Sequence, residues 1–309
     1  MLSARTRSVV FNTESMVCFR EAKLSQSGCG LSRTQRRDRC RFYWRWTAGS
    51  MPDRARSSDP LPAIFMDWDE ICQVNVGAAT VKEQLIWDEY LLRACEDGQI
   101  GPSIRTWVVH EPTVVLGYSN RPDREVHMAL CRQRGISVLR RTSGGGTVLL
   151  DAGCLNYSLI LPVAYHPSMA SVTLANQYIM EKQRRMLELC LGQKVALRGY
   201  TDLVIGERKV SGNAQRRGRS SVLFHGSFLC NADLGLIDEV LAFPSRQPAY
   251  RQARAHSQFL INLGISVSDL SQAVLSYWVK YSENMTDIIR SEAIWQDCHR
   301  RLARLSQAT

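Results

Sequence analysis

Three consecutive glycines interrupt the middle of this chain, in the stretch RRTSGGGTVLLDAGCLNYS that spans residues 140–158. Glycine loses more backbone freedom on folding than any other residue, so a triplet costs stability wherever it lies. Either a ligand approaches that backbone closely, or the chain turns in a way that other residues rarely adopt. The triplet therefore predicts a binding loop or a tight hairpin turn.

Hydrophobic periodicity on both sides of the triplet predicts which segments are helices and which are strands. Apolar residues at helical spacing indicate helices, and short β-type runs between turn residues indicate strands. Strands in meanders, with a few helices packed to one side, predict an α+β fold. Helices are expected over 78–98, 123–134 and 170–192, strands over 105–110, 113–118, 136–141, 146–151 and 154–162, a meander over 196–233, and a mainly helical segment from about residue 236.

The positive charge is concentrated at the start of the chain. The formal net charge is +10, and the first 60 residues hold twelve basic against five acidic side chains. Since the rest of the chain is close to neutral, we expect no nucleic-acid partner. Residues 1–62 are predicted to be a disordered basic leader. It could be a targeting segment, an arm that touches a polyanion, or a stretch upstream of a start at Met51 or Met66.

The ten cysteines are scattered singly and form no C-x-x-C pair, and the six histidines are equally dispersed. This pattern is typical of reduced, buried thiols, so a cytoplasmic location is expected and no protein-bound metal site. No run of about eighteen apolar residues occurs, so we expect no membrane span.

The glycine stretch matches neither a P-loop nor a G-x-G-x-x-G fingerprint. Arg140 and Arg141 directly before it are permanently charged donors suited to phosphate or carboxylate, and exposed backbone N–H groups in such a bend can bind an anion. A second stretch, DLVIGERKVSGNAQ at 202–215, places Lys209 beside small residues. A solvated strand lysine is the plain alternative, but in such a place its charge can pair with a phosphate or acyl oxygen.

In order, the glycine stretch, residues 202–215 and the segment FHGSFLCNADL resemble the lipoate–protein ligase A family of the biotin/lipoate protein ligase superfamily. PTVVLGYSNRPDREVH upstream and PSRQPAYRQARAHSQFLINLG downstream are similar to further motifs of that family. The resemblance implies a mixed, curved β-sheet with helices packed on its outer side. It also implies a catalytic domain over 63–265 and a short helical C-terminal extension over 266–309.

The resemblance further implies a two-step reaction, in which ATP activates lipoate to lipoyl-AMP and a lysine of a lipoyl domain then displaces AMP. The implied acceptors are the glycine cleavage H protein and the E2 subunits of 2-oxoacid dehydrogenases, with Mg²⁺ accompanying ATP. Lys209 would be catalytic, and Asp202 would lie near the nucleotide or Mg²⁺. The lipoate and adenylate pocket would be formed by Arg140, Arg141, Ser143, Gly144, Gly145, Gly146, Ser211, Gly212, Asn213 and His225.

Two departures from the family keep alternatives open. Leu150 stands where many members have a histidine, and only 45 residues follow Gly264, so the family's accessory domain is expected to be missing and a separate accessory subunit is conceivable. One alternative is an octanoyltransferase that takes octanoate from acyl carrier protein through a cysteine thioester. In relatives of that type the cysteine lies in the loop a few residues before the strand that here begins near Asp202. The matching loop of this chain, residues 192–203, contains no cysteine, and Cys154 is the thiol nearest in sequence to the glycines. The other alternative is a non-catalytic acyl-binding protein.

Overall fold

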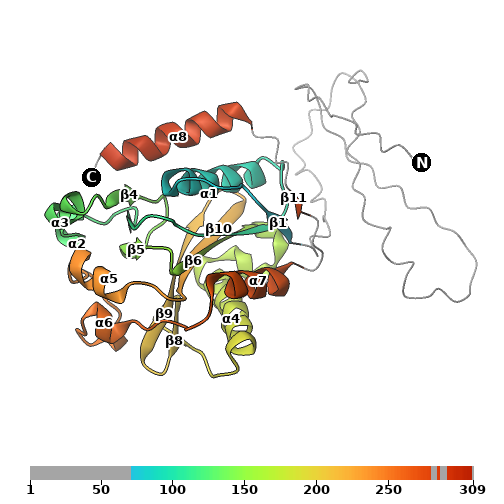
Figure 1. The fold of residues 1–309 in the computed structure, drawn as a ribbon. Coiled ribbons are helices and arrows are strands. Elements are labelled where there is room, and N and C mark those ends of the chain that lie inside the picture. Colours follow the sequence, from blue (N-terminus) through green and yellow to red (C-terminus); the bar gives the residue numbers. More distant parts are fainter. Residues whose placement is uncertain (1–70, 280–283, 286–290, 308–309) are drawn as a thin grey trace, which may run out of the picture. The chain divides into compact units, whose positions relative to one another are not determined.

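The computed structural model describes residues 71–279, 284–285 and 291–307, and Figure 1 shows their fold. The predicted basic leader over 1–62 lies outside the described residues. No helix among the described residues is both long and apolar enough to cross a membrane.

One large mixed sheet organises the fold. Its strand order is β11-β1-β2-β6-β10-β9-β8-β7. β1 pairs in parallel with β11 and β2, and the remaining neighbours are antiparallel. The strands are β1 (Cys72–Val74), β2 (Ser103–Trp107), β6 (Cys154–Pro162), β7 (Ala196–Arg198), β8 (Asp202–Ile205), β9 (Arg208–Arg217), β10 (Ser221–Leu229) and β11 (Asn284–Met285).

A second, three-stranded sheet carries the start and end of the glycine loop. β3 (Thr113–Leu116) lies in the middle, parallel to β4 (Ser137–Arg140) and antiparallel to β5 (Val148–Leu150). Because β4 ends at Arg140 and β5 begins at Val148, the loop that joins them contains the whole glycine triplet.

Helices cover both faces of the large sheet (Figure 1). Along β6, Leu155, Tyr157 and Leu159 belong to the core cluster on the face of α4 and α7, whereas Ile160 belongs to the cluster that contains α1. This is the two-residue alternation of a strand buried on both sides. The helices are α1 (Val81–Glu96), α2 (Pro122–Glu125), α3 (Met128–Gln133), α4 (Val172–Leu191), α5 (Leu234–Val240), α6 (His256–Phe259), α7 (Val267–Trp278) and α8 (Glu292–Gln307), with 3₁₀ turns η1 (Val163–Tyr165), η2 (Pro167–Ala170) and η3 (Ala249–Arg251).

The expected α+β architecture, with a mixed sheet and a helical C-terminal part, is confirmed. The helices lie on both faces of the large sheet and not on one side alone, because its central strand buries apolar residues on each face. Local chemistry explains where α1 begins and where α4 ends. α1 begins at a capping box in which Thr80 and Glu83 satisfy each other's backbone N–H groups, and α4 ends at Gly192 in the left-handed region. Both signals are readable from the residues themselves.

The single helix expected over 123–134 is wrong, because the structure breaks it into α2 and α3. Val126 adopts an extended conformation and forms a β-bridge with Leu241. The next residue, His127, donates its N–H to the carbonyl of Val240 at 2.9 Å. A partner more than 100 residues away therefore interrupts the helix, which local periodicity could not reveal.

The C-terminal helices belong to two different cores. Leu270, Val274 and Trp278 of α7 lie in the same cluster as α4, so α7 packs as part of the body that precedes the predicted boundary at residue 265. α8 instead lies along α1 (Figure 1), where Trp295 packs 4.7 Å from the ring of Trp87.

Candidate functional site

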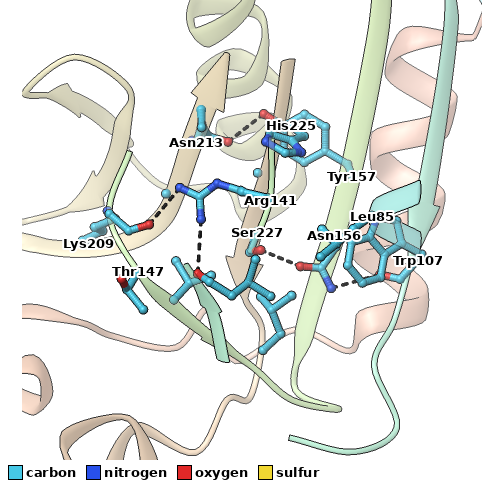
Figure 2. Close-up of a pocket in the computed structure, with 17 residues that line it drawn as sticks. Leu85, Trp107, Arg141, Thr147, Asn156, Tyr157, Lys209, Asn213, His225 and Ser227 are labelled. Carbon is cyan, nitrogen blue, oxygen red and sulfur yellow. Dashed lines mark hydrogen bonds between the residues drawn. The ribbon is translucent and has the colours of Figure 1, made fainter. Parts of the chain in front are cut away.

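A pocket of about 130 Å³ opens between the glycine loop and strands β2, β6, β9 and β10 (Figure 2). One end in Figure 2 holds Lys209 and Thr147, and the other holds Leu85 and Trp107, with Asn156 hydrogen-bonded beside them. The complete lining is Leu85, Trp107, Val115, Arg141, Gly146, Thr147, Val148, Leu150, Asn156, Tyr157, Lys209, Gly212, Asn213, Ala214, His225, Gly226 and Ser227. A cation at one end and apolar side chains at the other suit an acid with a hydrocarbon tail.

Lys209 owes its direction to a β-bulge. Leu203 of β8 pairs with Ser211, but the next residue of β8, Val204, pairs with Lys209, so Val210 is an extra residue in β9. In a regular strand, residues 209 and 212 would point to opposite faces of the sheet. The bulge shifts the alternation by one residue, and Lys209 and Gly212 both line the pocket. A Cβ atom on Gly212 would lie 2.9 Å from Lys209 Nζ, so glycine there leaves room for the amine.

The ammonium of Lys209 is paired with Asp202. Its Nζ lies 2.7 Å from Asp202 Oδ1, and both side chains are mostly buried. The second oxygen, Oδ2, accepts a hydrogen bond from the hydroxyl of Tyr250 at 2.8 Å. Asp202 therefore has both oxygens engaged, and no group of three or more His, Cys, Asp or Glu suited to a metal occurs among the described residues.

Arg141 shapes the glycine loop from inside. Its Nη2 donates to the carbonyls of Gly144 and Gly146 at 2.6 and 2.8 Å, and Nε donates to Ser143 Oγ at 2.9 Å. Gly145 between them has φ of 91°, a conformation that favours glycine. The loop is therefore a turn held around a buried guanidinium, and its three glycines are exposed.

Arg140, the neighbouring arginine, lies outside the pocket lining. Its Nη1 donates to the carbonyls of Gly117, Tyr118 and Asn120, and Nε donates to the carbonyl of Leu305 in α8. Successive residues of a strand point to opposite faces, so only one of two adjacent arginines can reach the pocket. Arg140 instead joins the loop 117–120 to the C-terminal helix.

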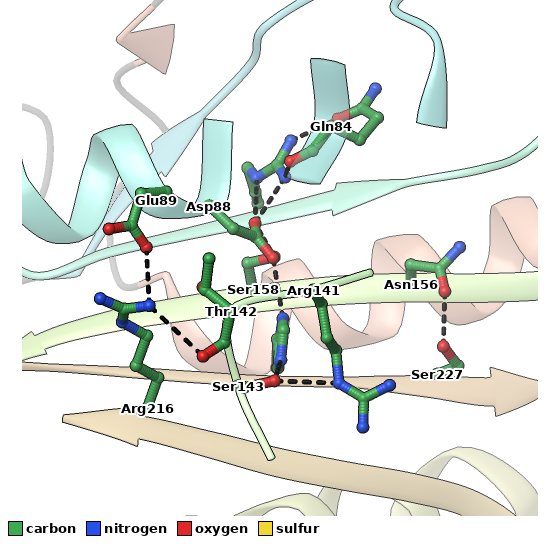
Figure 3. Close-up of polar contacts among 12 residues, drawn as sticks. Gln84, Asp88, Glu89, Arg141, Thr142, Ser143, Asn156, Ser158, Arg216 and Ser227 are labelled. Carbon is green, nitrogen blue, oxygen red and sulfur yellow. Dashed lines mark hydrogen bonds and ion pairs between the residues drawn. The ribbon is translucent and has the colours of Figure 1, made fainter. Parts of the chain in front are cut away.

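A buried chain of hydrogen bonds runs from the glycine loop to α1 (Figure 3). Ser143 Oγ lies 2.6 Å from His225 Nε2, and His225 Nδ1 lies 2.8 Å from Asp88 Oδ2. Because a carboxylate can only accept, Nδ1 carries a proton and donates it to Asp88, while Nε2 shares a hydrogen bond with the serine hydroxyl. The order resembles a Ser-His-Asp triad, but Ser143 is buried, does not line the pocket and accepts from Arg141. The chain therefore supports the loop and supplies no nucleophile.

Asp88 is the buried anchor of this chain. Its Oδ1 accepts from Ser158 Oγ at 2.5 Å and from the guanidinium of Arg105, which is itself 1% exposed. Burial pushes the pKa of Asp88 up, but the charge of Arg105 and the hydrogen bond with His225 outweigh it and lower the pKa from 3.8 to about 2. Asp88 is thus an anion at all ordinary pH values.

A second buried acid, Glu89, joins three arginines. Its Oε1 lies 3.2 Å from both Arg93 Nε and Arg301 Nη1, and its Oε2 lies 3.2 Å from Arg216 Nη1. Arg216 also donates to the carbonyl of Thr142 at 3.3 Å, as Figure 3 shows. Glu89 therefore connects α8 with the start of the glycine loop.

Apart from Arg140, the predicted site residues divide into four groups. Arg141, Gly146, Lys209, Gly212, Asn213 and His225 line the pocket, and Ser143 and Asp202 contact members of that lining. Gly144 and Gly145 are exposed in the loop. Ser211 is fully buried, and its hydroxyl lies beside the amide of Asn213.

The sequence interpretation missed Asp88, Glu89, Arg105 and Tyr250. One signal was present for the two acids: they stand side by side within LIWDEYLL, where a helix that buries its apolar face on the core also buries them. Charged residues are almost never fully buried unless they are paired. Two buried acids in one helical turn therefore called for basic partners elsewhere in the chain.

Asn213 needs a glycine beside it. Its Oδ1 accepts from Tyr157 OH at 2.7 Å, and its Nδ2 donates to the carbonyl of Thr201 at 2.7 Å. The side chain lies over Gly226, where a Cβ atom would be 1.9 Å from Asn213 Oδ1. Only glycine at position 226 of β10 leaves room for the Asn213 side chain to accept the hydrogen bond from Tyr157.

Gly226→Ala is expected to destabilise the protein by about 1–3 kcal/mol, because the added methyl group displaces Asn213 and overpacks a tight site. Urea unfolding followed by tryptophan fluorescence measures the change. Gly144→Ala is the matched control, since a Cβ atom there meets nothing within 4 Å. Equal stability of the two variants would contradict the assigned role of Gly226.

None of the seven cysteines in the described part of the chain lines the pocket. Burial raises the pKa of Cys95 and of Cys230 to about 11 and that of Cys298 to about 12. Burial also raises the pKa of Cys154, the thiol nearest the glycines in sequence. A nucleophilic cysteine needs a lowered pKa and access to substrate, and these thiols have neither.

The sequence profile of the lipoyl protein ligase A/B catalytic domain matches residues 80–277. A candidate lipoate-protein ligase A of Schizosaccharomyces pombe is 32% identical over 138 residues, which are 44% of this chain and 36% of that protein. The octanoyltransferase LipM of Halalkalibacterium halodurans is 30% identical over 212 residues, which are 61% of this chain and 75% of that protein.

Two solved structures share the fold. The first is a lipoate-protein ligase A bound with ATP (TM-score 0.61, 20% identity, 75% of this chain and 95% of that chain). The second comes from a study of a bipartite lipoate protein ligase and its E2 lipoyl domain from Thermoplasma acidophilum (TM-score 0.61, 18% identity, 75% and 92%). At these identities the likeness establishes the fold, and the expected mixed sheet with helices is the one observed.

Proposed function

Since this chain belongs to the lipoyl protein ligase A/B catalytic domain family, and is therefore an enzyme of the lipoate-attachment type, we propose that it is an ATP-dependent lipoate–protein ligase. The observation that carries the proposal is the position of Lys209. Its amine lies at one end of a pocket whose other end is apolar, and no described cysteine lines that pocket.

In the proposed first step, a lipoate carboxylate oxygen attacks the α-phosphate of ATP, and pyrophosphate leaves. Negative charge grows on the phosphate oxygens, and the Lys209 ammonium stabilises it, as does the row of backbone N–H groups in the glycine loop. The apolar lining around Leu85 and Trp107 takes the hydrocarbon tail. Holding both reactants in one geometry lowers the entropic part of the barrier.

In the second step, the amine of an acceptor lysine attacks the acyl carbon of lipoyl-AMP, loses a proton and expels AMP, which forms the amide. The same Lys209 ammonium would stabilise the acyl oxygen while it carries negative charge. Arg141 does not need to touch the substrate for this. It keeps the carbonyls of the glycine loop turned inward and leaves the loop's N–H groups for the anion.

The residues around the pocket do not fit a dedicated magnesium site. Asp202 is occupied by Lys209 and Tyr250, and no cluster of acidic or imidazole ligands occurs among the described residues. Mg²⁺ commonly keeps several waters and is held by one or two carboxylates together with substrate phosphates. Mg²⁺ would therefore enter with ATP.

The second candidate is an octanoyltransferase. The similarity to LipM over 75% of its length favours it. A thioester mechanism needs an accessible thiolate, but none of the described cysteines lines the pocket, and burial raises the pKa of Cys95, Cys154 and Cys230. The ligase therefore remains the first proposal.

The expected partners are lipoyl domains such as the glycine cleavage H protein and 2-oxoacid dehydrogenase E2, in the cytoplasm. The bipartite ligase of Thermoplasma acidophilum is a precedent for a separate accessory subunit. In this chain α8 contacts Arg140 and Glu89. A separate accessory subunit stays among the proposed partners.

The test is the intact mass of an unmodified lipoyl domain after incubation with the full chain. One sample contains lipoate, ATP and Mg²⁺, and the other contains octanoyl-acyl carrier protein without ATP. The expected result is an ATP-dependent lipoyl mass increase in the first sample alone. Modification only in the second sample would establish the transferase, and modification in neither would overturn both catalytic proposals.

A further inference from the structure

The segment after α5 that contains Tyr250, Arg251 and Arg254 has no role in the proposed reaction, yet it reaches Lys209. Ile261, a few residues later, donates its backbone N–H to the carbonyl of Lys209 at 3.0 Å. The Tyr250 side chain reaches the same lysine through a carboxylate. It donates to Asp202 Oδ2 at 2.8 Å, while Asp202 Oδ1 lies 2.7 Å from Lys209 Nζ.

We propose that Tyr250 is a positioning residue for Lys209 and acts through Asp202. This inference rests on the proposed function of Lys209 and adds a residue to it. Asp202 is then a placeholder anion, which holds the ammonium over Gly212 until the anionic part of the substrate replaces it.

Three contacts fix Tyr250 itself. Its ring packs 5.2 Å from that of Phe259, and Arg254 Nη2 donates to its backbone carbonyl at 2.9 Å. A Cβ atom on Gly199 would lie 3.7 Å from Tyr250 Cε1, so the loop before β8 passes directly against the ring. With its backbone held by Arg254 and its ring packed against Phe259 and the loop at Gly199, Tyr250 presents its hydroxyl in one place, which is what a positioning group requires.

The hydrogen bond determines how the Asp202 carboxylate is turned. With Oδ2 occupied by the phenol, Oδ1 is the oxygen that faces Lys209, and the carboxylate cannot rotate freely. Burial and the charge of Asp202 both raise the pKa of Tyr250, so the phenol stays protonated and remains a donor. A hydrogen bond to a charged group is among the stronger ones in proteins.

The neighbouring cations have partners of their own. His256 Nδ1 lies 3.3 Å from Asp238 Oδ1, and the Arg251 guanidinium lies over the rings of Phe243 and Phe259. Tyr250, Asp202 and Lys209 therefore form one chain of contacts, and His256 and Asp238 form a separate pair. Removal of the Tyr250 hydroxyl should change Lys209 and leave that second pair intact.

The first measurement does not depend on turnover. Ligand-free protein is treated briefly with an acetylating reagent, and the acetylation rate of Lys209 is compared by peptide mass with that of exposed Lys194. Tyr250→Phe is expected to raise the relative rate about fivefold, because a loosened carboxylate releases the amine more often. Asp202→Asn should raise it further, and the double variant should equal Asp202→Asn.

The second measurement is the rate of lipoyl-AMP formation in the same four proteins. Tyr250→Phe is expected to lower kcat about tenfold with little change in the KM for lipoate, and to add nothing in the Asp202→Asn background. Tyr200→Phe, in the adjacent loop and 95% exposed, is the control and should match the wild type in both measurements. Thermal unfolding checks that all variants are folded.

The two measurements separate the inference from the proposed function. Labelling of Lys209 that is unchanged by Tyr250→Phe, or that changes additively with Asp202→Asn, would overturn the inference whether or not the protein is a ligase. If the labelling pattern is as expected but the wild type forms no lipoyl-AMP, the positioning of Lys209 stands and the ligase reaction is wrong.

Discussion

Lys209→Ala is expected to lower the rate of lipoyl transfer by about 10²–10³-fold, the loss typical when one preorganised donor to a developing oxyanion is removed. The structure gives the reason, since the amine is the one lysine nitrogen in the described pocket lining. Binding of the apolar tail should change little, because the other end of the pocket is untouched. The measurement is kcat for ATP-dependent lipoylation together with the Kd for lipoate.

Lys194→Ala is the matched control, because Lys194 is an exposed lysine outside the lining. It should retain the wild-type rate. If Lys209→Ala lipoylates the acceptor at the wild-type rate, Lys209 is only a solvated strand residue and the proposed mechanism fails. If the rate is kept but the Kd rises sharply, Lys209 contributes binding of the ground state and no catalysis.

Asp88→Asn is expected to destabilise the fold by about 3–5 kcal/mol, the cost of leaving a buried charge without its partner. Arg105 would then lie 1% exposed beside a neutral amide, whose single oxygen cannot replace both the contact with Arg105 and the contact with His225. Urea unfolding measures the loss. Asp97→Asn is the control, because Asp97 directly follows α1 and its side chain is exposed. This substitution should change the free energy of unfolding by less than about 0.5 kcal/mol.

The pH dependence of the free energy of unfolding gives a second test of the Asp88 ion pair. The folded pKa of Asp88, about 2, lies below its ordinary value of 3.8, so its ion pair stabilises the protein fully above pH 3.8. That contribution is lost as the pH falls through 2. The stability difference between wild type and Asp88→Asn should therefore be constant near neutral pH and shrink below pH 4. A difference that is independent of pH would mean that Asp88 is not held as an anion.

The fold class and most elements could be predicted because their signals are local. The capping box before α1, the left-handed Gly192 after α4 and the alternation along β6 each depend on residues within a few positions of one another. The interruption between α2 and α3 could not be predicted, because it is made by a bridge to Leu241.

The candidate site was predicted in part for the same reason. The glycine triplet and a lysine among small residues are visible in the sequence, and Gly146 and Lys209 line the pocket. Arg140 and Arg141 cannot be told apart in the sequence, yet one shapes the loop and the other holds α8. Which residue of the pair faces inward depends on strand register.

The sequence by itself determined the family of the chain, the presence of a glycine loop and the identity of the lysine. Tertiary structure alone decided where that lysine points and what holds it. The bulge at Val210 sets its direction, Asp202 meets it from the neighbouring strand β8, and Tyr250 reaches Asp202 from 48 positions further along the chain. Likewise His225 and Asp88 are 137 positions apart. Backbone propensities act over a few residues, whereas charges and hydrogen bonds act across space, so only the folded chain specifies which groups meet.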